Sequence, residues 1–95
     1  MFKIFVKFKC FEGKRCEFVK RVKDEGILDL VRAEDGCRLY EYYYSDDRAD
    51  ELLLLEIWES EEHQKLHIDT PHMQKLRTFK GEYIYDTEIG EFYTK

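Results

Sequence analysis

The sequence predicts an α+β fold of the ferredoxin-like type, in which a β-α-β-β-α-β order gives an antiparallel sheet with helices on one face. Three observations predict it. Apolar and polar residues alternate over residues 2–9, as in a strand with one buried face. Apolar residues recur at three- and four-residue steps over residues 15–32, as on one face of a helix. Further strand-like segments follow at 37–45, 51–59 and 83–93.

The predicted helices have recognisable ends. Gly26 lies inside the 15–32 segment, where it weakens the helix and is expected to mark a bend or a close approach to a ligand. Gly36 suits the left-handed position that ends it. Ser60 is a good N-cap for a helix to about residue 69. Thr70 and Pro71 then predict a second start, with proline at the first position of a helix to about residue 79.

The third strand is unusual because Leu52, Leu53, Leu54 and Leu55 make it apolar on both faces. Such a strand is expected at the centre of a sheet that is covered on both sides. The chain's own helices supply one cover, and a second subunit is the simplest source of the other. Two sheets packed face to face would form a dimeric α+β barrel. The tyrosines at 40, 42 and 44 share one face of their strand and Tyr43 the other, and they either line a pocket or form the dimer contact.

Composition narrows the class of protein. Ninety-five residues make one domain. A net charge of -5 argues against binding to a nucleic-acid backbone. No apolar stretch is long enough to cross a bilayer, and the first residues do not resemble a signal peptide. The three cysteines form no Cys-x-x-Cys pair, so we expect reduced, buried thiols and a cytoplasmic location. The cysteines are Cys10, Cys16 and Cys37.

The residues most able to do chemistry lie between positions 56 and 73, which hold the only Trp, the only Pro and all three His. Glu56 and Trp58 share a strand face. His63 and His67 are four residues apart, so they share a helix face. His72 lies just inside the next helix.

Two interpretations of the histidines compete. A His pair at this spacing can chelate zinc, as in His-Glu-x-x-His enzymes, but Gln64 stands where a general-base Glu would, and no third ligand is evident. We therefore expect no metal site and a solvated His63. A histidine is also the usual proton acceptor near neutral pH. His67 is either such a group or a helix residue that only satisfies a hydrogen bond. His72 is either such a group or a helix N-terminal residue that fills space, and Trp58 is either a pocket wall or core.

At this segment the chain resembles the antibiotic biosynthesis monooxygenase family, especially its quinol monooxygenase branch. The resemblance is carried by Glu56-x-Trp58-Glu59-Ser60, by His63 and His67, by Thr70-Pro71-His72-Met73, and upstream by Gly13-Lys14 and by Glu34-Asp35-Gly36-Cys37 with Tyr40. It implies one such domain over residues 1–95, a homodimeric barrel and a ligand cavity between sheet and helices in each subunit.

The resemblance also implies an activity. Such monooxygenases oxidise electron-rich phenols or quinols with O2 and use no flavin, metal or haem. It makes His67 the catalytic base and His72 a second polar catalytic group. Trp58, Tyr40 and Glu56 are then the substrate-binding residues.

Two departures and two alternatives accompany this expectation. The chain has no Asn, and Arg77 stands where haem-degrading relatives have a His, so haem degradation is not expected. A non-enzymatic, dimeric ligand-binding or stress-associated domain remains open. So does an isomerase of a small carbonyl compound in which His67 carries the proton.

Overall fold

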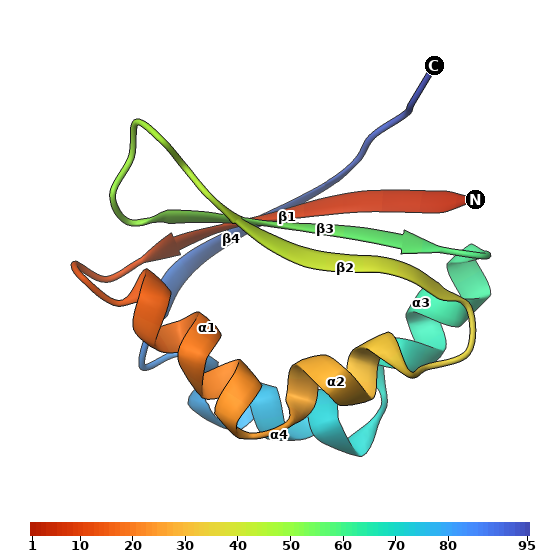
Figure 1. The fold of residues 1–95 in the computed structure, drawn as a ribbon, viewed down its shortest axis with the longest axis horizontal. Helices are drawn as coiled ribbons and strands as arrows, with labels where there is room; N and C mark the ends of the chain where they lie inside the picture. The colour runs from red at the N-terminus through yellow and green to blue at the C-terminus, as the bar shows by residue number, and fades with distance from the viewer.

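A four-stranded antiparallel sheet carries all four helices on one of its faces (Figure 1). The computed structural model describes residues 1–95. The strands β1 (Phe2–Cys10), β2 (Cys37–Tyr44), β3 (Glu51–Trp58) and β4 (Ile84–Glu91) lie in the order β2-β3-β1-β4. The predicted ferredoxin-like α+β fold is confirmed.

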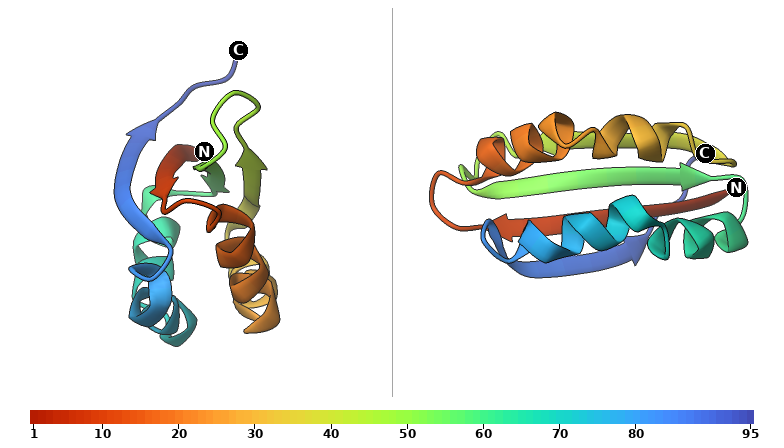
Figure 2. Two further views of the ribbon diagram at one scale, coloured as in Figure 1. Left: turned by 90° about the vertical axis from the view of Figure 1, so that its left-hand side faces the viewer. Right: turned by 90° about the horizontal axis from the view of Figure 1, so that it is seen from below.

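The helices form two rows that run along the sheet (Figure 2). One row holds α1 (Arg15–Asp24) and α2 (Ile27–Arg32), and the other holds α3 (Glu61–Ile68) and α4 (Pro71–Lys80). The expectation of one bent helix over 15–32 is wrong, because the chain forms two helices there. Gly26 has φ 74°, a left-handed conformation that ends the first helix and that glycine adopts without steric cost.

Both predicted N-caps hold the second row in place. The Ser60 hydroxyl accepts a hydrogen bond from the His63 N–H, and the Thr70 hydroxyl accepts one from the Met73 N–H. Pro71 occupies the start of α4, as predicted. The Thr70 hydroxyl also donates to the His67 carbonyl at 2.8 Å, which ties the end of α3 to the start of α4.

Strand β3 lies between β2 and β1, so the prediction of a central strand is confirmed. Its side chains alternate between the two faces of the sheet. Leu52, Leu54 and Trp58 are buried beneath the helices, whereas Leu53 and Leu55 on the other face are only half-buried. The opposite face therefore presents apolar side chains that this chain does not cover.

The structure also places the tyrosines and cysteines. Tyr40 is buried towards the helices, and its ring contacts that of Tyr42, whereas Tyr43 is exposed on the other face. Cys16 is exposed, so the expectation that every cysteine is buried is wrong at that position. None of the helices has the length and apolar character that crossing a membrane requires.

Candidate functional site

The five residues singled out in the sequence meet in one cluster between the sheet and the second row of helices. The His67 ring lies 4.8 Å from the Trp58 ring and 5.5 Å from the Tyr40 ring, measured between centroids. His67 is 2% exposed and Trp58 is fully buried. The cluster thus places an imidazole from α3 against aromatic rings from β3 and β2.

Glu34 joins the two catalytic candidates. Its Oε2 atom lies 2.8 Å from His67 Nδ1 and 2.8 Å from His72 Nε2. All three side chains are largely buried, with Glu34 13% exposed. One carboxylate oxygen therefore serves both histidines.

Glu34 was not among the site residues that the sequence predicted, although it belongs to the Glu34–Cys37 motif behind the family resemblance. It lies in the turn between α2 and β2, more than thirty residues before either histidine. In the sequence it precedes the glycine that ends a helix, and an acidic residue in such a turn is ordinarily solvated. Its only sequence signal as a site residue was membership of that motif.

The turn between α3 and α4 brings the two histidines to the same carboxylate. His67 lies in the last turn of α3, and His72 follows Pro71 in the first turn of α4. The two histidines are five positions apart, a spacing that would put them on different sides of a continuous helix. The turn through Thr70 changes the chain's direction, so both rings reach Glu34.

The hydrogen bonds assign the ring protons. A carboxylate accepts hydrogen bonds and does not donate them, so His67 Nδ1 and His72 Nε2 are the N–H donors to Glu34. This leaves His67 Nε2 with the lone pair. Burial lowers the pKa of His67, and the Glu34 carboxylate opposes that shift. His67 is accordingly a neutral imidazole whose free nitrogen can accept a proton.

Glu56 supplies a second carboxyl group beneath the helices. It is 4% exposed, and Trp58 Nε1 donates to its Oε1 atom at 2.9 Å. Burial raises the pKa of Glu56 to about 7; the bond from Trp58 lowers it, and the charge of Glu34 raises it further. The group can therefore exchange a proton near neutral pH.

The Tyr40 phenol stays protonated over the physiological range. Burial holds its pKa well above the usual value, and the nearby Tyr42 and Glu56 raise it further. A neutral phenol can donate a hydrogen bond to an anion. The buried Tyr40 phenol therefore keeps a proton that it can donate.

His63 lies outside this cluster. Its Nδ1 atom is 2.7 Å from the Ser60 hydroxyl, and its Nε2 atom is 3.4 Å from an Asp35 carboxylate oxygen. The side chain is 26% exposed. The His63–His67 pair at helical spacing is therefore not a chelate, because the two rings take different partners.

The residues able to hold a metal ion are instead Glu34, His67 and His72, whose ligand atoms all lie within 4.8 Å of one another. This set of residues was not foreseen from the sequence, which drew attention to His63 and His67. The expectation of no metal and no cofactor stays a prediction.

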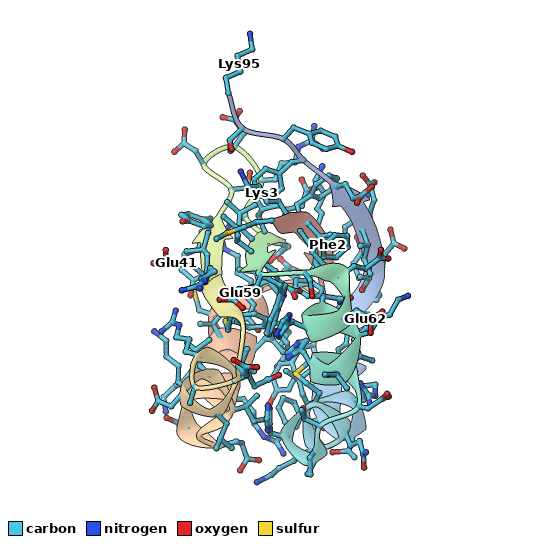
Figure 3. All side chains as sticks on the ribbon, turned by 90° about the vertical axis from the view of Figure 1, so that its right-hand side faces the viewer. Phe2, Lys3, Glu41, Glu59, Glu62 and Lys95 are labelled. Carbon is cyan, nitrogen blue, oxygen red and sulfur yellow. The ribbon has the colours of Figure 1, made fainter.

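The cluster is closed in this conformation. Side chains fill the space between the two helix rows (Figure 3). His67, His72 and Trp58 line none of five hollows on the surface of the domain. Tyr40 does line one, a hollow of about 390 Å³ along β2 that also includes Arg32 and Cys37. A ligand would reach His67 only after side chains move.

The fold and the site define a class: a ferredoxin-like α+β domain with a carboxylate-bound histidine buried among aromatic rings. The sequence profile of the antibiotic biosynthesis monooxygenase family matches residues 1–78. The chain belongs to this family.

Solved structures agree with that assignment at the level of the fold. A conserved protein from Methanosarcina mazei Go1 is similar in fold, with a TM-score of 0.86. It is 24% identical over 99% of this chain and 92% of that one. Rv0793 from Mycobacterium tuberculosis has a TM-score of 0.80 and 26% identity over 99% and 94% of the two chains.

A structure described as an antibiotic biosynthesis monooxygenase has a TM-score of 0.84, with 14% identity over 100% of this chain and 99% of that one. Among curated proteins, none matches the chain.

Proposed function

We propose that the protein oxidises a small, electron-rich phenol or quinol with O2, without a bound cofactor, and that His67 is the general base. The observation that carries this proposal is the 2.8 Å contact between Glu34 and His67 Nδ1, with the His67 ring held against Trp58 and Tyr40. Membership of the monooxygenase family supports it.

The proposed reaction balances without an external reductant. A hydroquinone and O2 give a hydroxyquinone and water: one oxygen atom enters the ring, the other leaves as water, and the substrate supplies all four electrons. The first step moves a hydroxyl proton from the substrate to His67 Nε2. The resulting anion is a far better electron donor to O2 than the neutral quinol.

The surrounding side chains have roles in this scheme. Glu34 holds His67 in the tautomer that leaves Nε2 free, and it stabilises the imidazolium after proton transfer. The Tyr40 hydroxyl donates to the substrate anion, and Trp58 stacks on its ring. Glu56 fixes the Trp58 indole and sits at the edge of the substrate, and His72 holds Glu34 from the other side.

Oxygen uptake with a panel of hydroquinones and naphthohydroquinones tests the proposal. We expect catalysed uptake above autoxidation, and a fall of about 10²–10⁴-fold in kcat/KM for His67→Ala. His63→Ala is the matched control, because it removes an imidazole one helical turn away, and it should stay within twofold. Full turnover by a folded His67→Ala protein would refute the assignment of the base.

The packed state of the cluster favours a second candidate, a dimeric binding domain with no catalysis. Tyr40, Trp58 and His67 occupy the space that a substrate would need. Calorimetry with the oxidised quinones distinguishes the two functions. Saturable binding that depends on Trp58, with no oxygen uptake for any quinol, would favour the binding domain.

We also propose that the chain works as a homodimer through the open face of the sheet. Phe5 and Leu55 pair across β1 and β3 on that face and are only half-buried. The β2–β3 connection and the C-terminal segment also project to that side (Figure 1). Two such faces would bury each other's apolar surface.

Light scattering tests the dimer. The wild-type protein should have twice the chain mass of 11.6 kDa. Leu55→Lys should shift it to the monomer. Leu66→Lys, the same change at an exposed leucine on α3, should leave the mass unchanged. A monomeric wild-type protein at the concentrations used for oxygen uptake would contradict this part of the proposal.

A further inference from the structure

The cluster of Glu34, His67 and His72 has the composition of a transition-metal site. One oxygen and two ring nitrogens converge from three separate segments: the turn before β2, the end of α3 and the start of α4. All three side chains are largely buried, so their positions are set by packing. Two imidazoles and one carboxylate are a donor set that divalent first-row transition metals bind.

The distances suit such an ion. Zinc and its neighbours bind nitrogen and oxygen at about 2.0–2.2 Å, which places neighbouring ligand atoms roughly 3–3.5 Å apart in a tetrahedral site. Here the oxygen lies 2.8 Å from each nitrogen, and all three atoms fall within 4.8 Å of one another. The two oxygen–nitrogen separations would have to widen by roughly 0.2–0.7 Å to reach that spacing.

The local backbone holds the ligands ready. Thr70 caps α4 and also donates to the His67 carbonyl, so the two histidine-bearing segments are fixed to one another. Glu56, buried nearby, adds a second carboxyl group whose charge favours a cation. The Arg77 guanidinium, which donates to the Ile68 carbonyl at 3.0 Å, is a nearby positive group that opposes it.

We propose that Glu34, His67 and His72 bind one divalent ion of the zinc, cobalt and nickel class, and that the ion converts His67 from a proton acceptor into a proton donor. Without the ion, His67 Nδ1 carries the proton and donates it to Glu34, which leaves the Nε2 lone pair free. A metal takes the lone pair of Nδ1, so the ring proton moves to Nε2. Nε2 then has no lone pair with which to accept a proton.

The binding site stands on the three ligands alone, whereas its effect on catalysis rests on the proposed function. If His67 Nε2 is the base, the occupied site is inactive in the oxidation. The ion is then an inhibitor that acts by fixing the wrong tautomer, not by occupying the substrate's place.

Cobalt titration of tag-free, chelator-treated protein tests the site. Calorimetry should give one Co²⁺ per chain, and visible absorption should show the bands of a low-coordinate ion. His72→Ala and Glu34→Gln should weaken binding at least tenfold. His63→Ala is the matched control and should bind as the wild type does. Mg²⁺, which requires an oxygen-rich octahedral site, should not compete.

Each outcome decides one question. Absence of Co²⁺ binding by the wild type, equal binding by His72→Ala, or loss of binding in His63→Ala would overturn the site. Nitrogen-detected NMR of the histidine rings gives a second readout, since the His67 proton should move from Nδ1 to Nε2 when Zn²⁺ is added. An unchanged tautomer in a protein that binds Zn²⁺ would overturn the switch.

Oxygen uptake separates this proposal from the function beneath it. Chelator-treated protein tests the oxidation alone, and one equivalent of Zn²⁺ should reduce its rate to that of His67→Ala. A protein that binds the ion but never consumes oxygen would refute the function and keep the site. A protein that consumes oxygen but binds no ion would keep the function and refute the site.

Discussion

Two neighbouring carboxylates, Glu34 and Asp35, each contact a histidine of α3, yet the two regions differ completely in environment. Glu34 is 13% exposed and bonds a His67 that is 2% exposed. The Asp35 side chain is 96% exposed and lies 3.4 Å from a partly exposed His63. Adjacent acidic residues of the turn and histidines one helical turn apart thus form two carboxylate–imidazole pairs, one buried and one at the surface.

The difference teaches that burial, and not pairing itself, distinguishes His67 from His63. The Asp35–His63 pair lies at the surface, where water and salt screen the attraction between its charges. The buried pair fixes the tautomer of His67, and the lack of solvent lowers the pKa of that ring. A sequence pattern that counts only residue types and spacing treats the two pairs alike.

The largest expected effect comes from removing the buried carboxylate of Glu34, with the surface carboxylate of Asp35 as the control. Glu34→Ala leaves two buried N–H groups without an acceptor, and we expect it to reduce the free energy of unfolding by about 2–5 kcal/mol. Asp35→Ala should change it by less than about 0.5 kcal/mol. Urea denaturation followed by circular dichroism, at one protein concentration, measures both. Equal losses in the two variants would remove the distinction between the buried and surface pairs.

The next effect concerns the charge of Glu56. Its folded-state pKa, about 7, lies above the unfolded value of about 4.3. The folded protein therefore holds this proton more tightly than the unfolded chain does. The contribution of Glu56 to the free energy of unfolding is greatest below the unfolded pKa and falls as the pH rises to about 7. Glu56→Gln keeps an acceptor for the Trp58 N–H and cannot ionise. It should be more stable than the wild type at pH 8 by up to about 3 kcal/mol, and equal to it at low pH.

Denaturation curves of the wild type and Glu56→Gln between pH 4.5 and pH 8 measure this difference. A gap between the two proteins that stays constant with pH would mean that Glu56 ionises as an exposed carboxyl group does. Glu56 would then lack the raised pKa that its burial indicates.

The smallest effect concerns Gly36, which supports the surface pair. It has φ 81°, and a Cβ atom there would lie 2.4 Å from the His63 ring. Gly13 has φ 74° with open space around it. Gly13→Ala should cost about 1 kcal/mol for the left-handed backbone alone, and Gly36→Ala about 1 kcal/mol more.

The double variant Gly36→Ala/His63→Ala isolates the contact, because it removes the ring that the new methyl group meets. Its cost relative to His63→Ala should return to that of Gly13→Ala. If the extra cost of Gly36→Ala persists without His63, it arises elsewhere in the turn.

Most of the fold was predictable because its signals are local. The N-caps at Ser60 and Thr70, the alternation in β1 and the two-faced leucine strand each depend on residues close together in the sequence. The break at Gly26 was predicted only as a bend or a close approach to a ligand. A glycine inside a helical pattern is compatible with a bend or a complete stop, and the outcome depends on how Ile27 and Leu28 pack in the core.

The site was predictable only in part, for the same physical reason. Trp58, His67 and His72 stand within fifteen residues of one another, and their local spacing already suggested a site. Their connection through Glu34 joins segments more than thirty residues apart. Such a contact depends on how the α2–β2 turn packs against α3, which residue spacing does not encode. For His63 we predicted a solvated helix residue, and the ring is in fact partly exposed and bonded to the N-cap residue of its own helix.

The single tryptophan has a practical consequence. Trp58 is fully buried, its ring lies beside that of His67, and its N–H donates to Glu56. The protein's only indole therefore contacts two side chains that can change their charge, the imidazole of His67 and the carboxyl group of Glu56. An imidazolium or a neutralised carboxyl group alters the fluorescence of a neighbouring indole. Emission from this one fluorophore therefore reports the protonation of the cluster and the arrival of any ligand beside it, with no label attached.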